Sequence, residues 1–217
     1  MTRQRLTTRR MTGLAGLTVA ILFGAGNALW AFEQPGASAG GQEVLAFYAD
    51  TSSRIIAGAS LSLLAVAVFV LFASGVRAML WKLEGDDLLA STAFGGALLL
   101  SAAGLGAETI NMVGALRAGD GQLTPELGRT LFEISYVLGY NAAGVGLGIF
   151  VLAIAAAALR ARALLPRWLA LLLLIVGLAC ITPLSRFLLA PLVLLLAVAS
   201  VQLIRSTRSD GARASSG

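Results

Sequence analysis

Six apolar stretches separated by short polar segments constrain the fold of this chain more than any other feature. An α-helix rises about 1.5 Å per residue, so roughly 20 apolar residues cross the hydrocarbon core of a bilayer. Only 12% of the residues are charged and 58% are hydrophobic, which is too little charge to cover a water-exposed surface. The sequence therefore predicts an all-α bundle of six transmembrane helices within residues 13–204. The expected spans are about 13–32, 54–76, 88–116, 130–159, 168–181 and 184–204.

The distribution of positive charge predicts how these helices thread through the membrane. With six spans, 12 of the 16 Lys and Arg residues lie on the side of both termini, and cytoplasmic loops are the ones enriched in these residues. We therefore expect a basic cytoplasmic N-terminus over 1–12, a disordered cytoplasmic tail over 205–217, and a place in the inner (cytoplasmic) membrane. The remaining four lie on the outer side: Arg54, Arg117, Arg129 and Arg186.

The N-terminal segment also has features of a secretory signal peptide. A basic start precedes the apolar run 13–32, and Arg9-Arg10 weakly resembles a twin-arginine signal. However, the run is long enough to span the bilayer, and Leu29 makes a poor small-residue cleavage site. We expect the first helix to be retained. The lipid bilayer is then the expected partner, and the charge distribution argues for topology and against nucleic acid.

The composition excludes several chemistries. The chain has no histidine, which excludes histidine-ligated haem, most zinc sites and Ser-His nucleophile pairs. Its single cysteine, Cys180, excludes an intrachain disulfide and a thiolate metal cage. An intramembrane aspartyl protease needs two embedded aspartates, whereas Asp86, Asp87 and Asp120 fall in predicted loops. We therefore predict a protein that is not an enzyme and has no metal or cofactor.

Two carboxylates, Glu108 and Glu133, fall inside the apolar runs. An ionised side chain at the centre of a bilayer costs about 2.5–3.5 kcal/mol even on the lenient insertion scale, so such residues are candidates for function. At 100° per residue, each carboxylate shares a helix face with other polar or small residues. These are Ser101, Gly104, Asn111 and Ala115 beside Glu108, and Tyr136, Tyr140 and Gly144 beside Glu133.

The helical rise predicts which of these residues meet. If 88–116 and 130–159 form an antiparallel hairpin, Glu108 lies about 12 Å below the outer boundary, level with residues 136–141. Asn111 is then level with Ser135. This predicts an outward-facing polar pocket of Glu108, Asn111, Tyr136, Tyr140 and Asn141.

The same depth calculation predicts an ion pair near the outer boundary. Arg186 lies three residues into the last run, at about the depth of Glu133. We expect Glu133 to have a mainly structural role there. Glu108 has two open interpretations, a proton- or cation-sensitive site accessible from outside, or a buried polar clamp that sets helix register.

Several local signals predict helix ends. Thr124-Pro125-Glu126 has the order of an N-cap, a first-turn proline and a first-turn acid, so the fourth helix is expected to start near Pro125. Glu43 to Tyr48 predicts a short separate helix at the membrane interface. Asp86 or Asp87 is expected to cap the third helix.

Several stretches resemble a group of uncharacterised bacterial multi-pass membrane proteins of this length, common in high-GC genomes. They are the basic N-terminus, Glu43-Val-Leu-Ala-Phe-Tyr-Ala-Asp ahead of Arg54-Ile-Ile-Ala-Gly, and Leu165-Pro-Arg-Trp-Leu. The resemblance implies a domain of unknown function. It therefore implies no activity and no site residue.

Two functions of different kinds stay open. The polar pocket around Glu108 favours a protein that handles a small molecule or ion, or a sensor. Stripes of small residues, such as Gly16-Ala20-Gly24 and Gly144 with Gly148, favour a structural or partner-binding bundle without a ligand. An intramembrane enzyme is a third, weaker alternative. The sequence identifies neither a small ligand nor a protein partner.

Overall fold

The computed structural model describes residues 3–84, 87–160, 166–182 and 185–214. In this part of the chain every secondary-structure element is helical, as the sequence predicts. The elements are α1 (Arg3–Ala28), the 3₁₀ turn η1 (Ala31–Glu33), α2 (Gly41–Glu84), α3 (Leu88–Gly119), α4 (Pro125–Tyr136), the π-helical segment η2 (Val137–Ala142), α5 (Ala143–Arg160), α6 (Arg167–Cys180) and α7 (Ser185–Ala214).

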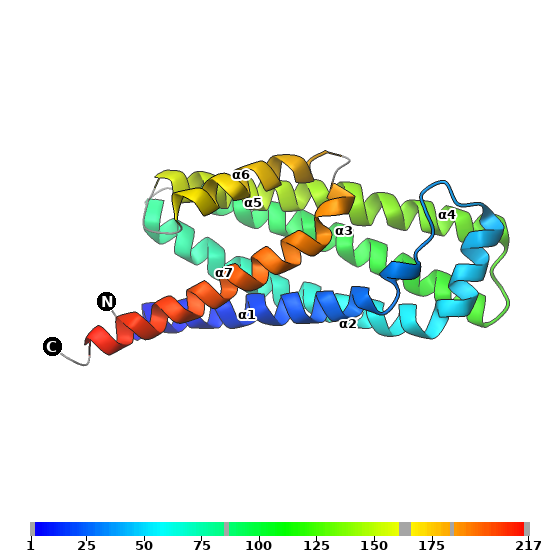
Figure 1. Cartoon of the computed structure of the whole chain (residues 1–217), viewed down its shortest axis with the longest axis horizontal. Coiled ribbons are helices and arrows are strands. Elements are labelled where there is room, and N and C mark those ends of the chain that lie inside the picture. Colours follow the sequence, from blue (N-terminus) through cyan, green and yellow to red (C-terminus); the bar gives the residue numbers. More distant parts are fainter. Residues whose placement is uncertain (1–2, 85–86, 161–165, 183–184, 215–217) are drawn as a thin grey trace.

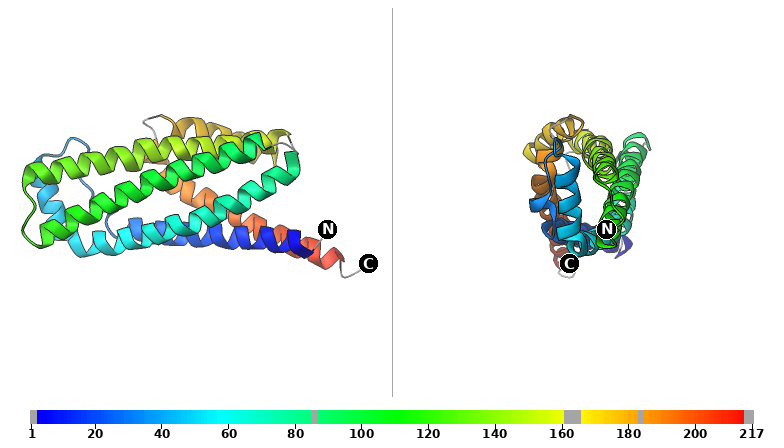
Figure 2. Two further views of the ribbon diagram at one scale, coloured as in Figure 1. Left: turned by 180° about the vertical axis from the view of Figure 1, so that it is seen from behind. Right: turned by 90° about the vertical axis from the view of Figure 1, so that its right-hand side faces the viewer.

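The long helices lie roughly along one common axis and form a bundle (Figures 1 and 2). Helix α1 packs on α2, α2 on α3, and α3 on α5, so consecutive long helices are neighbours. Helix α6 packs on α5, and α7 then crosses the bundle diagonally to pack along α1. Because of this crossing, both ends of the chain lie at the same end of the bundle (Figure 1).

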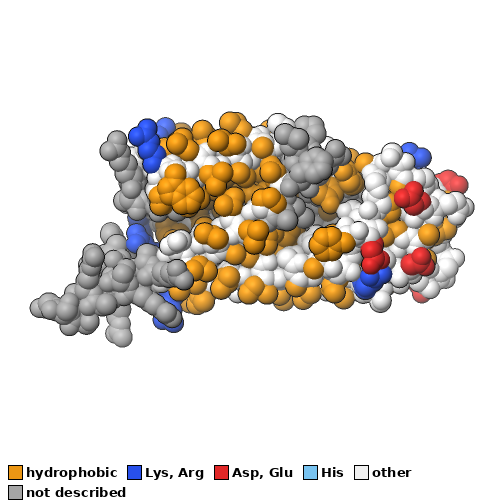
Figure 3. All heavy atoms as spheres, in the orientation of Figure 1, with side chains coloured by type: hydrophobic (Ala, Val, Ile, Leu, Met, Phe, Trp, Pro, Cys, Tyr) orange, Lys and Arg blue, Asp and Glu red, His pale blue; other side chains and the backbone are white. Residues whose placement is uncertain are grey.

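The apolar helices define a membrane protein. Four helical segments are long and apolar enough to cross a bilayer: Thr8–Ala28, Gly41–Lys82, Leu88–Gly119 and Pro125–Arg160. Hydrophobic side chains cover the middle of the face in Figure 3, whereas charged side chains gather at its two ends. The predicted fifth and sixth spans correspond to two shorter apolar helices, α6 and the segment Pro191–Ile204. Six spans and cytoplasmic termini therefore stay predictions.

Helix α2 differs most from the sequence-based expectation. The predicted interfacial helix at Glu43 to Tyr48 is the first part of one 44-residue helix, and it runs across the end of the bundle before α2 turns along it (Figure 1). Within this helix the hydroxyl of Thr51 donates to the carbonyl of Phe47. Hydrogen bonds of this kind to residue i−4 often bend a helix without ending it, and the chain stays helical through Thr51.

The ends of three other helices can be compared with the helix starts and the disordered tail that the sequence predicts. Thr124 caps α4, because its Oγ1 accepts a hydrogen bond from the backbone N–H of Leu127 at 3.3 Å, and Pro125 is the first residue of the helix. Asp87 precedes α3, but its side chain makes no capping bond and lies 3.4 Å from Arg77. Where a disordered tail is predicted from residue 205, α7 continues through Ala214, since extending an existing helix needs no new nucleation.

Buried side chains form a compact group at the end of the bundle opposite the termini. It joins the start of α2 to α4 and to the end of α3, with the ring centroids of Phe47 and Phe132 6.5 Å apart. Val44 and Tyr48 are fully buried in it. We call this group the end cluster: Trp30, Ala39, Val44, Phe47, Tyr48, Ile55, Ala115, Leu123 and Phe132.

Glycines allow the helices to approach closely at their crossings. A Cβ built on Gly146 of α5 would lie 2.4 Å from the backbone nitrogen of Leu100 in α3, and one on Gly58 of α2 would lie 2.5 Å from the carbonyl oxygen of Gly26 in α1. Gly148, predicted as part of a small-residue contact, lies against Gly177 of α6. These contacts leave no room for side chains at the crossings, as is common between transmembrane helices.

Candidate functional site

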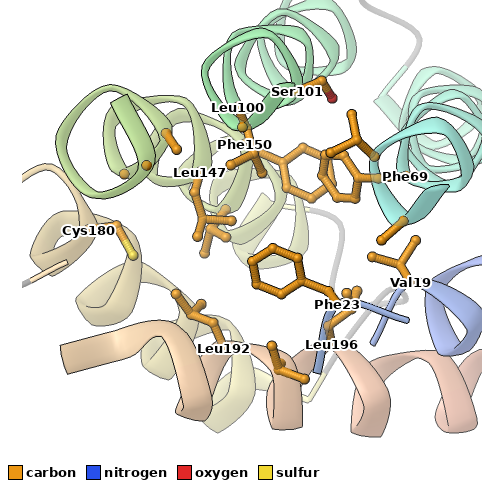
Figure 4. A pocket seen from close by; sticks show the side chains of 18 of the residues that line it. Val19, Phe23, Phe69, Leu100, Ser101, Leu147, Phe150, Cys180, Leu192 and Leu196 are labelled. Atoms are coloured by element: carbon orange, nitrogen blue, oxygen red, sulfur yellow. The ribbon is translucent and has the colours of Figure 1, made fainter. Parts of the chain in front are cut away.

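A cavity of ≈ 310 Å³ lies inside the bundle, lined by residues of every α-helix and of η2. Most of its lining is aliphatic or aromatic. Figure 4 shows Phe23 and Val19 of α1, Phe150 of α5 and Leu192 and Leu196 of α7 arranged around it. Its volume falls in the range of small-molecule sites, about 300–1,000 Å³, which are also mostly apolar with a few polar groups.

The polar side chains of the lining are not spread evenly. They come from the end of α1 and the segment after it, from the middle and second half of α3, and from the α4–η2 junction. The rest of the cavity, which we call its apolar body, is lined by apolar side chains. It extends towards the end of the bundle with the termini, as far as Leu80 of α2 and Leu203 of α7. The polar end consists of Asn27, Gln34, Ser101, Glu108, Asn111, Ser135, Tyr136 and Tyr140.

Glu108 is the acidic residue at this polar end. Its side chain is buried, with 8% of its surface exposed, and Oε2 has no hydrogen-bond partner among the described residues. The Ser62 hydroxyl of α2 is a neighbour of this carboxyl. Oγ of Ser62 has no hydrogen-bond partner among the described residues either. An oxygen of this kind is costly to bury without a partner. Glu108 and Trp30, whose Nε1 is also without a partner in the described structure, are therefore the lining residues with a buried polar atom free to bind.

Asn111, one helical turn further along α3, is fully engaged at its carbonyl. Its Oδ1 accepts hydrogen bonds from the hydroxyl of Tyr48 at 3.1 Å and from that of Ser135 at 2.7 Å. These two donors tie α3 to α2 and to α4. The level of Asn111 with Ser135, predicted from helical rise, is confirmed. Asn111 is a clamp between helices as well as part of the cavity lining.

Two tyrosines from the α4–η2 junction line the cavity beside Glu108. The rings of Tyr136 and Tyr140 are 4.6 Å apart between centroids, and Tyr140 interacts electrostatically with Glu108. The Tyr140 hydroxyl donates to Oε1 of Gln34, 3.0 Å away, in the segment that follows α1. This bond joins segments that are 106 residues apart in the sequence.

The π-helical segment decides which residues of this junction face the cavity. A π turn holds more residues than an α turn, so it rotates the residues after it relative to an uninterrupted α-helix, and such segments are frequent at functional sites. Tyr140 within η2 lines the cavity, but Asn141 is exposed and does not line it. The predicted pocket therefore forms without Asn141.

The predicted ion pair at Glu133 has a different partner in the described structure. Oε1 of Glu133 accepts a hydrogen bond from Nε of Arg129 at 2.8 Å, one turn earlier in α4, and both side chains are about half exposed. The side chain of Arg186 lies outside the described residues, so the predicted contact is not described. Glu133 does not line the cavity.

Other residues of the site are missing from the sequence-based set. Gln34, Asn27 and Trp30 come from the end of α1 and the segment after it, and Tyr48 comes from the start of α2. Asn27 is an amide within the first apolar run, so the sequence could have identified it as a candidate for the polar pocket. Gln34 lies in a polar loop, where nothing in the local sequence distinguishes it from its neighbours.

No group of three or more histidine, cysteine, aspartate or glutamate side chains in the described part of the chain is placed to hold a metal ion. No family model matches the chain, and no curated protein or solved structure is significantly similar to it. The function is therefore argued from the cavity and its residues.

Proposed function

We propose that this integral membrane protein binds a small molecule in the cavity around Glu108, as a carrier or sensor and not as an enzyme. The observation that supports this most is a buried carboxylate with an unpartnered oxygen at the polar end of a cavity of ≈ 310 Å³. Carboxylates inside membrane proteins usually pair with a partner or line a functional path. A bound ligand supplies the partner that the described residues do not.

The orientation is part of the same proposal. The end of the bundle with the termini carries Arg9, Arg10, Arg77, Lys82 and Arg160, as expected of a cytoplasmic side. The opposite end carries Glu33, Glu43, Asp50, Asp120, Glu126 and Glu133. We infer that the termini face the cytoplasm and that the protein lies in an inner (cytoplasmic) membrane, as the distribution of Lys and Arg predicts. The polar end of the cavity then lies towards the outside.

The alternative is a structural or partner-binding bundle without a ligand. The close glycine contacts at Gly26 with Gly58 and at Gly96 with Gly146 favour it, because they stabilise a tightly packed helix array. These contacts lie at helix crossings and do not depend on the cavity. Filling the cavity therefore separates the two functions.

Gly104 offers a way to fill the cavity from α3. It lines the cavity, and a Cβ there would meet only Val66, at an ordinary 3.8 Å, so the side chain of Gly104→Leu enters the empty space. Gly95 of the same helix is exposed and has nothing within 4 Å of a built Cβ. Gly95→Leu is therefore the matched control for helix propensity and added apolar surface.

The test measures thermal unfolding of full-length protein in lipid nanodiscs against a panel of organic cations, anions and neutral metabolites. We expect at least one compound to raise the melting temperature of the wild type and of Gly95→Leu but not of Gly104→Leu. If every compound affects the three proteins equally, the bundle without a ligand is the better description.

A further inference from the structure

We propose that the ligand is a lipophilic organic cation, an ammonium group on an extended apolar body, with the ammonium group paired to Glu108. This inference rests on the proposed function and specifies its ligand class. It is carried by the charge, the aromatic rings and the shape of the cavity, taken in turn below.

The charge of the lining favours a cation. Among the described residues that line the cavity, Glu108 is the charged one, and none is a lysine or arginine. Of the four arginines predicted at this end, Arg54 pairs with Glu33 and Arg129 with Glu133. Arg117 does not line the cavity, and the side chain of Arg186 lies outside the described residues. A buried carboxylate without a counter-charge is strongly disfavoured. A cationic ligand supplies the missing charge, whereas an anionic ligand adds repulsion.

Three other polar side chains of the lining already make hydrogen bonds, whereas Nε1 of Trp30 is a buried donor without a partner among the described residues. The carbonyl oxygen of Asn111 accepts two hydroxyl hydrogen bonds, and that of Gln34 accepts one from Tyr140. The amide of Asn27 donates to the Phe23 carbonyl at 2.9 Å within α1. Oε2 of Glu108 is a buried acceptor of the polar end that a ligand can engage without breaking an existing bond in the described structure.

Aromatic rings line the same end of the cavity as this carboxylate. Tyr136 and Tyr140 line the polar end with their rings in contact, and Trp30 lines it from the end of α1 with its N–H edge against Gly58 of α2. The faces of tyrosine and tryptophan attract cations, and aromatic groups of this kind recognise quaternary ammonium ligands. A site with a carboxylate and three aromatic side chains binds an ammonium group in preference to an alcohol or an acid.

The apolar body of the cavity sets the rest of the ligand. Lining residues on α2 extend from Ala65 to Leu80, which is about 22 Å along a helix. This part of the lining is apolar along its whole length, so an extended alkyl chain matches its shape and chemistry.

The test compares three probes with the same ten-carbon chain: decyltrimethylammonium, decanol and decanoate. Their dissociation constants are measured for full-length protein in nanodiscs, with binding to empty nanodiscs subtracted. We expect decyltrimethylammonium to bind the wild type at least tenfold more tightly than decanoate. Glu108→Gln should weaken the ammonium probe at least tenfold, about 1.4 kcal/mol, and leave decanol unchanged.

Two variants keep the test informative about Glu108 itself. Glu108→Asp retains the charge and should retain the preference for the cation. Glu133→Gln removes an exposed carboxylate outside the cavity and should bind all three probes as the wild type does. If decanol or decanoate binds as tightly as the cation, or if Glu108→Gln has no effect, the cation proposal is overturned.

The outcomes also separate this inference from the proposed function. One outcome is that decanol or decanoate binds as tightly as the cation and that Gly104→Leu abolishes this binding. The cation proposal is then wrong, but the cavity is still a binding site. If no probe shows binding that depends on Gly104, the cation proposal fails, and the wider compound panel decides the proposed function.

Discussion

The end cluster and the cavity place buried polar groups of the same helix in opposite situations. Asn111 touches the end cluster through Tyr48, and its carbonyl oxygen accepts from two hydroxyl groups. Glu108, three residues earlier on α3, borders the cavity and keeps one oxygen without a partner in the described structure. Both side chains are buried to a similar degree, at 6% and 8% exposed. Burial alone therefore does not distinguish a structural residue from a candidate for binding.

The difference lies in how many partners each group has. A buried polar group with its hydrogen bonds made holds helices in register, and removing it leaves its partners unsatisfied. A buried polar group without them destabilises the empty protein and gains from a ligand. The comparison predicts opposite stability effects for substitutions one helical turn apart.

The largest effect is expected for Tyr48→Ala in the end cluster. Tyr48 is fully buried, and truncating a buried aromatic side chain typically lowers the free energy of unfolding by about 3–5 kcal/mol. The measurement is denaturant unfolding in mixed micelles, with Tyr48→Phe as the control that keeps the ring and loses only the hydroxyl. Equal losses in the two variants would mean that the hydrogen bond to Asn111, and not packing, dominates.

A smaller loss is expected for Asn111→Ala. This change leaves the hydroxyl groups of Tyr48 and Ser135 without their shared acceptor, at a cost of about 1–3 kcal/mol in the free energy of unfolding. Asn141→Ala, an exposed amide on η2, is the control and should change stability by less than about 0.5 kcal/mol. An unchanged stability in Asn111→Ala would remove the distinction between the two regions.

Glu108→Gln should leave the stability of the ligand-free protein unchanged or higher. The substitution removes a carboxyl with an unpartnered oxygen and keeps its shape, and exchanging buried ionisable groups for neutral ones is often neutral or stabilising. Unfolding of ligand-free protein at neutral pH measures this. A loss as large as that of Asn111→Ala would assign Glu108 to the structural clamp instead.

The smallest effect concerns the exposed pair of Glu33 and Arg54 at the end of α1. The pKa of the Glu33 carboxyl is lowered, mainly because it accepts a hydrogen bond from the Arg54 guanidinium. A carboxyl with a lowered folded-state pKa stabilises the protein above its unfolded pKa, and this contribution is lost as pH falls through the folded value. The melting temperature of the wild type should slightly exceed that of Glu33→Gln at neutral pH. The gap should close as pH falls below about 4, and a gap that widens instead would contradict the pairing.

Several features of the site follow from local pattern. Glu108 and Asn111 share a face of α3 because they are three residues apart in a helix of 3.6 residues per turn. Asn111 meets Ser135 because antiparallel helices of known rise bring equal depths together. Thr124 and Pro125 start α4 because capping depends on backbone groups within one turn. Each of these needs only the sequence within a helix or a hairpin.

Other features needed the packed structure. Asn141 leaves the site because a π turn changes the phase of the helix, and no periodicity in the sequence announces that turn. Gln34 reaches Tyr140 across 106 residues, a contact that depends on how the segment after α1 returns over the bundle. The first part of α2 joins the end cluster because it runs across the end of the bundle before the same helix turns along it (Figure 1).

Hydropathy and helical periodicity thus determine the membrane class, the all-α architecture and the polar faces of α3 and α4, because burial in lipid and the helical repeat act on neighbours in sequence. The cavity, the partners of Asn111 and the unpartnered oxygen of Glu108 depend on side chains from α1, α2, α5, α6 and α7. Their positions follow from helix crossings set by glycines that touch backbone to backbone. Such contacts depend on three-dimensional fit between distant segments, so the tertiary structure decides them.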